Sequence, residues 1–453
     1  MSLEVIILAA GKGTRMRSEQ PKVLHLLAGK PMLLHTIEQA QKLAPRRTHI
    51  IVGHGAEQVA QLVQPLEVDC VVQTQQLGTG HAVAQAMPRV DDDALVLILY
   101  GDVPLVPASL MQQLVDQACQ SSLSILTVKL ADVSGYGRIL RNTQGRIQAI
   151  IEHKDANPEQ LNINEINTGI LAVKANLLKA WLPRLNTDNA QAEIYLTDIV
   201  AMAVADGINI GHLEPDYPQQ TQGVNDRLQL AELERWHQRQ QANQLLHNGV
   251  QLADPTRFDL RGQLTTGNDV SIDINVIIEG QVQLGNNVHI GPNCFIKDAS
   301  IGSGTHIFSN SVIDQAQVGP NCQIGPFARL RPGTVMHESA KIGNFVETKK
   351  TILGKGSKAN HFTYLGDTKV GAEVNIGAGT ITCNYDGINK FETIIEDGAF
   401  IGSNSSLVAP LTIGAGATVA AGSAITKDVA QHNLAIARGK QRNLAAWAKP
   451  IKI

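Results

Sequence analysis

The first half of the chain alternates short apolar runs with longer amphipathic segments. The apolar runs are rich in Val, Ile and Leu and lie at residues 5–8, 50–52, 70–73, 95–99 and 124–129. Segments with a helical pattern, such as 32–43 and 79–86, lie between them. Short uninterrupted apolar runs are typical of parallel strands that are buried on both faces. The alternation therefore predicts a doubly wound, Rossmann-like α/β domain.

A mostly polar segment, residues 225–247, follows this half. It begins with Asn225 and Asp226, either of which can cap a helix, and Gly249 follows its end. A helix of about 22 residues is roughly 33 Å long, and one that is polar nearly all round often connects two domains. We therefore predict a domain at 1–224, a linker helix within 225–249, and a second domain at 250–453.

From about residue 250 the aliphatic residues recur every six positions. The series begins Ile272, Ile278, Leu284, Ile290, Ile296 and continues, after some shorter steps, to Ile425. Small residues such as Cys294 and Cys322 stand four positions after an aliphatic one. Hexapeptide repeats indicate a parallel β-helix, in which three hexapeptides form one coil and coils stack ~4.8 Å apart. We predict a left-handed parallel β-helix of hexapeptide repeats, with about nine or ten coils over 250–427.

The repeat weakens at 336–358 and again at 382–393, and we expect loops to leave the coils there. Function on a repeat scaffold concentrates in such interruptions. Both contain polar residues, and His361, Asn375 and Asn384 lie near them. Because residues about one coil apart stack in a β-helix, these three side chains should lie within one or two coils of each other.

Composition excludes several classes of protein. The 40 glycines and 4% aromatic residues fit a repetitive, tightly turning backbone. A net charge of −3, with both signs scattered, argues against nucleic-acid binding. The five cysteines form no C-x-x-C pair, which favours a reducing compartment over a disulfide framework. The first apolar run is too short for a signal peptide or a membrane span, so we expect a cytoplasmic protein without membrane insertion.

Candidate phosphate chemistry follows the first apolar run. Its glycine-rich turn, Gly11-Lys12-Gly13, would let backbone N–H groups approach a triphosphate, and Lys22 could neutralise charge. The turn is neither a Walker A loop nor G-x-G-x-x-G, and a purely structural turn explains it equally well. Asp102, after the fourth run, could bind Mg²⁺ together with Asn225, although a helix cap would also explain this aspartate.

The second domain offers a different chemistry. A neutral imidazole with a pKa near ~6.5 can take the proton of an attacking amine, so His361 is a candidate general base. Arg331, Lys349 and Lys390 could bind the phosphate of a sugar phosphate. The alternative is that His361 is an ordinary surface histidine.

These motifs resemble the bacterial family of bifunctional N-acetylglucosamine-1-phosphate uridyltransferases/glucosamine-1-phosphate acetyltransferases. The resemblance covers residues 5 to about 438. The motifs that carry it are Gly11-x-Gly13-Thr14-Arg15-Met16, Pro21-Lys22, Gly78-Thr79-Gly80-His81, Tyr100-Gly101-Asp102, Gly135-Tyr136-Gly137-Arg138, Glu152-His153-Lys154 and Glu165-Ile166-Asn167-Thr168-Gly169.

The resemblance implies a nucleotidyltransferase in the first domain. Its UTP and sugar-nucleotide site would comprise Leu8, Ala9, Ala10, Gly11, Lys22, Gln73, Gly78, Thr79, Tyr100, Gly101, Asp102, Gly137, Glu152, Asn167 and Asn225. Within this set Lys22 would act on the phosphates and Asp102 and Asn225 would hold Mg²⁺. The sugar would lie on Gly137, Glu152 and Asn167.

The resemblance implies an acetyltransferase in the second domain. His361 would be the general base, with Asn384 and Ser403 assisting. Glucosamine-1-phosphate would contact Arg331, Lys349, Tyr364, Asn375 and Lys390, and acetyl-CoA would contact Ala378, Asn384, Tyr385, Ser403, Ala421 and Arg438. Asn404 stands where the family often has an acidic residue. The family also implies a homotrimer assembled through the β-helix.

Two other functions compete with this hypothesis. The β-helix could regulate a nucleotidyltransferase, as in the pyrophosphorylases of storage-sugar synthesis, or it could serve only for assembly. The cluster of His361 and the 384–387 loop favours the bifunctional enzyme, because neither a regulatory nor an assembly module needs a base near an amine.

Overall fold

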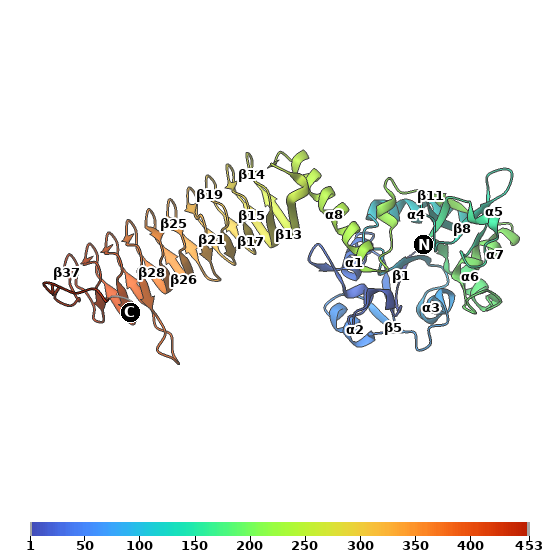
Figure 1. Cartoon of the computed structure of the whole chain (residues 1–453). Helices are drawn as coiled ribbons and strands as arrows, with labels where there is room; N and C mark the ends of the chain where they lie inside the picture. Colours follow the sequence, from blue (N-terminus) through green and yellow to red (C-terminus); the bar gives the residue numbers. More distant parts are fainter. Residues whose placement is uncertain (1, 451–453) are drawn as a thin grey trace. The chain divides into compact units, whose positions relative to one another are not determined.

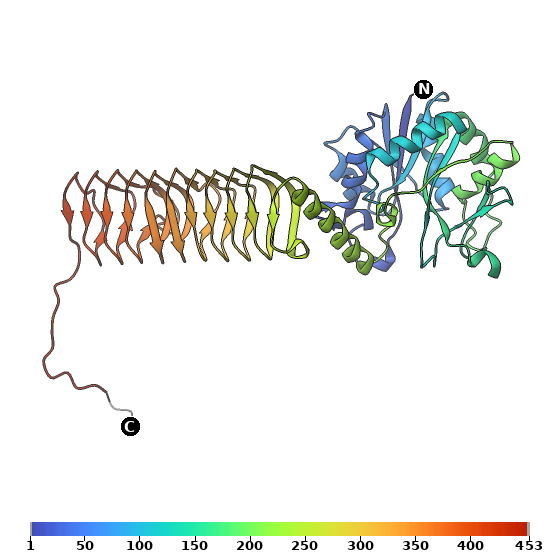
Figure 2. The same cartoon turned by 90° about the horizontal axis from the view of Figure 1, so that it is seen from above.

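The computed structural model describes residues 2–450, shown in Figures 1 and 2. The chain divides into two compact units, the first ending at His237 and the second beginning at Gln238. The first contains a sheet with helices around it, and the second is a stack of coils (Figure 1). The division falls inside one helix, α8.

The first unit is built on a mixed sheet in the order β11-β7-β10-β6-β1-β4-β5. The strands are β1 (Leu3–Ala9), β4 (Arg47–Val52), β5 (Asp69–Val72), β6 (Leu95–Tyr100), β7 (Leu123–Lys129), β10 (Glu165–Lys174) and β11 (Gly211–Leu213). All five predicted apolar runs are therefore strands. β1 is parallel to both β4 and β6, and β4 is parallel to β5.

One part of the sheet differs from the prediction. We expected residues 124–129 to form a buried parallel strand like the others, but β7 is parallel only to the short β11 and antiparallel to β10. β10 is also antiparallel to β6 and pairs with a hairpin of β8 (Arg138–Arg141) and β9 (Ile147–Ile151). A strand buried on both faces has the same apolar run whichever way its neighbour points, so the sequence could not reveal this direction.

Helices cover both faces of the sheet. They are α1 (Met32–Gln41), α2 (Ala56–Val63), α3 (Thr79–Ala86), α4 (Ala108–Ser121), α5 (Pro158–Leu161), α6 (Ala175–Trp181) and α7 (Ile199–Ala205). Side chains alternate along β1, so Val5 and Ile7 pack with α1, α2 and α4, whereas Ile6 shares its core with α3, α6 and α7. This is the doubly wound arrangement that the sequence predicts.

Helix α8 (Arg227–His247) belongs to both units. In the first unit its Leu233 packs with Met16 and Met32. In the second unit, Ala242 and Leu245 join the core of the coils. The helix starts two residues after the predicted Asn225 and ends at the predicted His247.

The second unit is a parallel β-helix. One face is an 11-stranded sheet with one short strand per coil: β12 (Gln251–Leu252), β14 (Ser271–Ile272), β16 (His289–Ile290), β19 (His306–Ile307), β22 (Gln323–Ile324), β25 (Lys341–Asn344), β27 (Lys358–His361), β29 (Asn375–Ile376), β32 (Phe400–Ile401), β35 (Thr418–Val419) and β37 (Leu434–Ala435). We predicted nine or ten coils over residues 250–427. That prediction does not include β37, because Ala435 lies beyond the end of the hexapeptide series.

The other two faces form one 15-stranded sheet. Its strands are β13 (Phe258–Thr266), β15 (Val276–Leu284), β17 (Phe295–Lys297), β18 (Ser300–Ile301), β20 (Val312–Asp314), β21 (Gln317–Val318), β23 (Arg329–Leu330), β24 (Val335–Met336), β26 (Glu347–Leu353), β28 (Tyr364–Val370), β30 (Ile381–Cys383), β31 (Thr393–Ile395), β33 (Ser406–Val408), β34 (Leu411–Ile413) and β36 (Ala424–Ile425). Long strands such as β15 turn the corner, because β15 pairs with β17 at one end and β18 at the other. All these pairings are parallel and in register, as in the left-handed β-helix that the repeats predict.

The repeat residues fill the interior of the coils. Aliphatic residues in equivalent positions of successive coils, such as Ile307 and Ile324, are buried and pair directly. Cys294 and Cys322 are also buried, which confirms that they are packing residues. All five cysteines are free thiols. No helix within residues 2–450 has the length and apolar character needed to cross a membrane.

The two interruptions of the repeat have different structures. The first, 336–358, does not leave the coils, which corrects our expectation. Thr348 replaces an aliphatic residue in the interior, and Thr351 occupies a small-residue position, where it pairs with Thr368. The Thr351 hydroxyl donates to the Leu365 carbonyl at 2.8 Å, so the buried oxygen is satisfied. The second does form a loop: Ala359 pairs with Ile376, 17 residues on, but Ile376 pairs with Ile401, 25 residues on. The additional residues form a hairpin that projects from the stack (Figure 1).

Adjacent isoleucines in β31 allow a test of the interior packing. Ile395 is 0% exposed and its neighbour Ile394 is 36% exposed. We expect Ile395→Ala to lower the free energy of unfolding by about 2–5 kcal/mol, because it leaves a cavity. The matched Ile394→Ala should cost about 1 kcal/mol or less. Urea denaturation followed by far-UV circular dichroism measures both, and equal losses would contradict this assignment of the core.

Candidate functional sites

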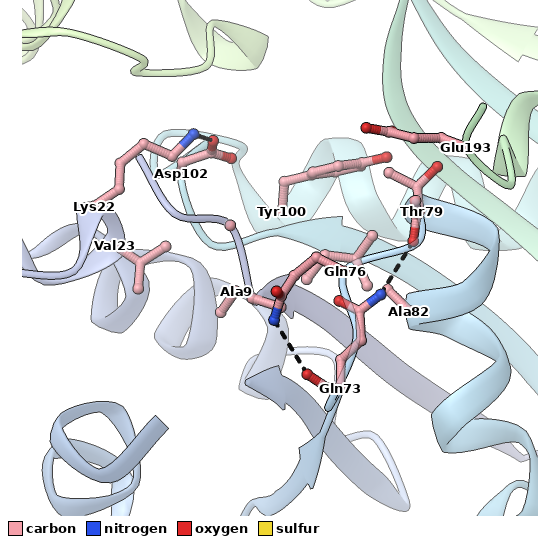
Figure 3. Close-up of a pocket in the computed structure, with 14 residues that line it drawn as sticks. Ala9, Lys22, Val23, Gln73, Gln76, Thr79, Ala82, Tyr100, Asp102 and Glu193 are labelled. Atoms are coloured by element: carbon pink, nitrogen blue, oxygen red, sulfur yellow. Dashed lines mark hydrogen bonds and ion pairs between the residues drawn. The ribbon is translucent and has the colours of Figure 1, made fainter. Parts of the chain in front are cut away.

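The first unit has a pocket of about 270 Å³ at the carboxyl ends of β1 and β6. From this pair of neighbours the chain leads from β1 to β4 on one flank and from β6 to β7 on the other, and α/β sheets bind ligands where the strand order diverges in this way. Its lining residues are Leu8, Ala9, Ala10, Gly11, Lys22, Val23, Gln73, Gln76, Gly78, Thr79, Ala82, Tyr100, Asp102 and Glu193 (Figure 3). The fold therefore brings together residues from turns that lie far apart in the sequence.

Two glycines in this region are required by the geometry. Gly13 has a φ of +59°, and a Cβ there would lie 2.6 Å from the Cβ of Lys22. Gly78 has a φ of +112°, and a Cβ there would lie 2.5 Å from the carbonyl oxygen of Ile194. Side chains rarely adopt such φ values, so only glycine permits both turns.

A cation and a carboxylate meet at the end of the pocket. The Lys22 ammonium forms an ion pair with Asp102 (Figure 3). It also donates to Asn225 Oδ1 at 3.3 Å. The Asp102 carbonyl accepts the Val224 N–H at 2.9 Å, and this bond holds Asn225 beside the carboxylate. The two side chains that we predicted as Mg²⁺ ligands thus lie together, with Lys22 between them.

Oxygen donors at this point suit Mg²⁺ better than a metal that needs a protein cage. No group of three or more His, Cys, Asp or Glu side chains in residues 2–450 is placed to hold a metal ion. Mg²⁺ usually takes one or two protein ligands and completes its shell with water and substrate phosphates. One carboxylate and one amide oxygen fit that requirement.

The predicted sugar-binding residues form a group next to the pocket. Gly137, Glu152 and Asn167 are not among its lining residues, and neither are Gly101 and Asn225. The Asn167 N–H donates to the Gly137 carbonyl at 2.9 Å, and a Cβ on Gly137 would lie 3.4 Å from the Glu152 carboxylate. Burial raises the pKa of the Glu152 carboxyl group. Burial also raises the pKa of the Tyr100 phenol, and the nearby charge of Glu152 raises it further. Tyr100 lines the pocket, and a Cβ on Gly169 would lie 2.5 Å from its ring, so Tyr100 adjoins both the pocket and this group.

The second unit places His361 in a stack of paired strands. His361 in β27 pairs with Asn344 in β25, and the imidazole Nδ1 lies 2.7 Å from Asn344 Oδ1. An amide oxygen can only accept, so the proton is on Nδ1 and the lone pair of Nε2 is left for a substrate. No motif assigns a role to Asn344, but its position 17 residues before His361 indicates that the two residues stack.

A column of backbone groups continues from His361 along the coils. The His361 carbonyl accepts the Gly379 N–H at 3.3 Å, the Ala378 carbonyl accepts the Asn404 N–H at 2.7 Å, and the Ser403 carbonyl accepts the Gly422 N–H at 2.8 Å. The Arg438 guanidinium donates to the Ala421 carbonyl at 2.8 Å. The predicted acetyl-CoA residues Ala378, Ser403, Ala421 and Arg438 therefore occupy successive coils on one corner.

A cationic cluster lies on the next face. Lys390 lowers the pKa of Lys349, and Arg331 acts in the same direction, so the three positive side chains are close to one another. Arg331 donates to Glu347 at 2.8 Å. Like charges kept together on a surface indicate an anionic ligand, because their repulsion is relieved when an anion binds.

Polar side chains gather beside these cations. A Cβ on Gly366 would lie 2.4 Å from the Tyr364 hydroxyl and 2.8 Å from Asn384 Nδ2, so both groups lie over that glycine. Asn384 donates to Asp367. Tyr385 lies in the hairpin, where its backbone pairs with that of Lys390 in an isolated antiparallel β-bridge. Asn375 lies apart on the first face, between Lys358 and Phe400 of the adjacent coils.

Comparison with known proteins agrees with both halves of this description. Residues 5–163 match the model of the MobA-like NTP transferase domain, residues 260–354 the GMPPB C-terminal domain, and residues 392–427 the hexapeptide repeat of succinyl-transferase. Curated proteins named "Bifunctional protein GlmU" match the whole chain. The one from Marinobacter nauticus is 57% identical, that from Cellvibrio japonicus 58%, and that from Idiomarina loihiensis 56%, each over 99% of both chains.

The chain belongs to the GlmU family. This confirms the resemblance on which the sequence analysis relied. Among solved structures, a nucleotidyl transferase from Methanothermobacter thermautotroptrophicus aligns with 55% of this chain and 99% of its own, at 18% identity and a TM-score of 0.37.

In this member of the GlmU family the sequence did not indicate three residues that line the first pocket: Val23, Ala82 and Glu193. A fourth lining residue, Gln76, lies in the loop from Gln73 to His81, whose amide groups the sequence did indicate for binding a base. Val23 and Ala82 directly follow residues of recognised motifs. Gln76 donates to the Gln73 carbonyl at 3.3 Å. Glu193 comes from a segment more than a hundred residues away from the turn at Thr79, and nothing in its local pattern indicates a site.

Proposed function

We propose that this GlmU-family chain carries out two consecutive reactions in the synthesis of UDP-N-acetylglucosamine. The second unit acetylates glucosamine-1-phosphate with acetyl-CoA. The first unit then transfers UMP from UTP to N-acetylglucosamine-1-phosphate and releases pyrophosphate. The observation that carries the proposal is that the chain holds both a glycine-rich phosphate pocket with a Lys22–Asp102–Asn225 cluster and a histidine with a free Nε2 near a cluster of cations.

Uridyl transfer needs positioning and charge neutralisation but no protein nucleophile. A phosphate oxygen of the sugar phosphate attacks the α-phosphorus of UTP in line, and the bond to the β-phosphate breaks. Leu8 to Gly11, Gln73, Gly78 and Thr79 hold the nucleotide, and Lys22 neutralises its phosphates. Glu152, Gly137 and Asn167 hold the sugar, with Tyr100 and Gly101 between the two substrates.

Mg²⁺ is the cation that we assign to Asp102 and Asn225. When bound, it neutralises charge on the triphosphate and on the departing pyrophosphate. In the structure the Lys22 ammonium contacts the side-chain oxygens of both Asp102 and Asn225. Its flexible side chain lets it turn to the phosphates when they bind.

Acetyl transfer begins with proton removal from the amine of glucosamine-1-phosphate. His361 Nε2 takes the proton as the nitrogen attacks the thioester carbonyl, and Asn344 stabilises the resulting imidazolium through Nδ1. The C–S bond then breaks and CoA leaves as the thiol. Arg331, Lys349 and Lys390 bind the phosphate, and Tyr364 binds the sugar. Asn375, which lies apart from Tyr364 on the first face, is assigned to the sugar by the family resemblance alone.

The acetyl-CoA site lies at the corner of the β-helix where Ala378, Ser403, Ala421 and Arg438 occupy successive coils. Ala378, Ser403 and Ala421 present small side chains that leave room for an extended pantetheine chain, and Arg438 suits its phosphates. Asn384 and Ser403 assist the base or the oxyanion, with Tyr385 beside them. The five free thiols are compatible with the reducing cytoplasm as the place of action.

A homotrimer through the β-helix completes the proposal. Phe327, Phe345 and Phe362 stack at one corner, with ring centroids 5.3 and 5.2 Å apart, and their side chains are about half exposed. All three have φ near +50°, which bulky residues rarely adopt. Exposed aromatic rings in strained positions beside His361 support an interface there, formed with other copies of the chain.

Replacing the general base should separate the two activities. We expect His361→Ala to reduce acetyl transfer at least about a hundredfold, because the amine loses its proton acceptor. Uridyl transfer should stay at the wild-type rate. The release of CoA thiol and of pyrophosphate measures the two reactions in one preparation. His289→Ala, an exposed histidine on the same face, is the control. Unchanged acetyl transfer would instead favour a regulatory or assembly role for the β-helix.

The metal assignment is tested in the first unit. Asp102→Asn removes a carboxylate charge with little change of size. We expect it to lower Mg²⁺-dependent pyrophosphate release at least about a hundredfold, because charge stabilisation at the phosphates is lost. The control is Asp93→Asn, an exposed aspartate just before β6. Normal pyrophosphate release by Asp102→Asn would show that the metal is bound elsewhere.

The trimer is tested by placing charge in the aromatic stack. We expect Phe345→Glu to shift the sedimenting species to the mass of one chain and to lower acetyl transfer, while uridyl transfer persists. A buried unpaired carboxylate in an interface is strongly unfavourable. Leu228→Glu, at an exposed position in the first unit, should leave the mass unchanged. If Phe345→Glu keeps the wild-type mass, the stack is not the interface.

A further inference from the structure

A segment that no motif marks, residues 189–197, joins the two sides of the nucleotidyl-transfer site. It lies between β10 and α7 in the sequence and ends in the short 3-10 helix Leu196–Asp198. Glu193 in this segment lines the pocket together with Tyr100 and Thr79 (Figure 3). The segment therefore lies next to the groups proposed to bind both substrates.

One end of the contact network is the nucleotide loop. The Ile194 N–H donates to the Leu77 carbonyl at 2.7 Å, and the Gly80 N–H donates to the Ile194 carbonyl at 2.9 Å. The Leu196 N–H donates to Thr79 Oγ1 at 3.1 Å. Three hydrogen bonds, together with the close approach of Gly78 to Ile194, fix the segment to the loop that is proposed to hold the nucleotide.

The other end of the network is the sugar side. Thr197 is buried, and its hydroxyl donates to Glu152 Oε1 at 2.9 Å. The Ala190 N–H donates to Asp155 Oδ1 at 2.8 Å. Thr197 lies next in sequence to Leu196, which Thr79 holds, so the nucleotide loop and the Glu152 carboxylate are connected through two adjacent residues.

We propose that Thr197 is a positioning residue for uridyl transfer: it holds the Glu152 carboxylate, ionised and correctly oriented, for the sugar phosphate. This rests on the proposed function, in which Glu152 binds the sugar. A hydroxyl that donates to a carboxylate stabilises its charged form and fixes its rotamer, and a charged acceptor binds sugar hydroxyl and amide donors more strongly than a neutral one does.

The surroundings of Glu152 make this hydrogen bond important. Burial raises the pKa of Glu152, and the carboxylates of Asp198, Asp155 and Glu193 raise it further. The phenols of Tyr100 and Tyr195 also face it. The Thr197 hydroxyl opposes these effects and lowers the pKa. Without it the carboxyl would take up a proton at a higher pH, so sugar binding would be lost nearer to neutrality.

The test compares Thr197→Val, which keeps the shape of the side chain, with Thr197→Ser, which keeps the hydroxyl. We expect Thr197→Val to raise KM for N-acetylglucosamine-1-phosphate about tenfold, and KM for UTP and kcat less than about twofold. The acid limb of kcat/KM for the sugar phosphate should move upward by about one pH unit. Thr197→Ser should restore wild-type behaviour.

Controls separate this role from a structural one. Thr187→Val makes the same change at an exposed position of the same connection and should have no effect. Thr197→Val in a Glu152→Gln background should add less than about twofold to KM, because the carboxylate that it serves is absent. Equal rises in KM with Thr197→Val and Thr197→Ser, or an unmoved acid limb, would overturn the inference.

The single variant Glu152→Gln distinguishes a wrong role for Thr197 from a wrong placement of the sugar. If it raises KM for the sugar phosphate while Thr197→Val behaves as wild type, only the role of Thr197 is wrong. If Glu152→Gln leaves that KM unchanged, the placement of the sugar on Glu152 is wrong, and the inference falls with it.

Discussion

In-register pairing of parallel strands is the constraint on which both candidate sites depend. In the first unit, Leu8 pairs with Tyr100, so the turns after β1 and β6 leave the sheet at the same edge and meet over one pocket. In the second unit, residues 17 or 18 positions apart stack, so Asn344 lies against His361. A slip of one residue in either sheet would turn these side chains to the opposite face.

The two sites handle charge in opposite ways. In the pocket of the first unit the protein supplies both signs, because Lys22 pairs with Asp102 before any substrate arrives. On the β-helix, Lys349 and Lys390 lie together with partial compensation from Asp367. The first arrangement sets a cation and a carboxylate together where a metal–triphosphate would bind, whereas the second attracts a phosphate monoester by its excess positive charge.

The corner of the β-helix shows how function alters a repeat. The backbone there is left-handed in successive coils, and Asn293, Asn310, Gly379, Asn404 and Gly422 occupy the position as steric rules predict. Three coils carry phenylalanine instead. These three coils end at His361, so the departure from the preferred residue types coincides with the proposed catalytic corner, where strain is expected to concentrate.

The sequence by itself determined the five apolar strands, the helices between them, the hexapeptide β-helix and the glycine-rich turns, because periodicity and turn residues act locally. It also indicated Leu8 to Gly11 and His361 through their place in those patterns. Only the tertiary structure decided that β10 runs antiparallel, that Lys22 lies between Asp102 and Asn225, and that Asn344, Glu193 and Thr197 adjoin the sites. These are contacts between distant segments, and they depend on strand register and packing, which no local pattern records.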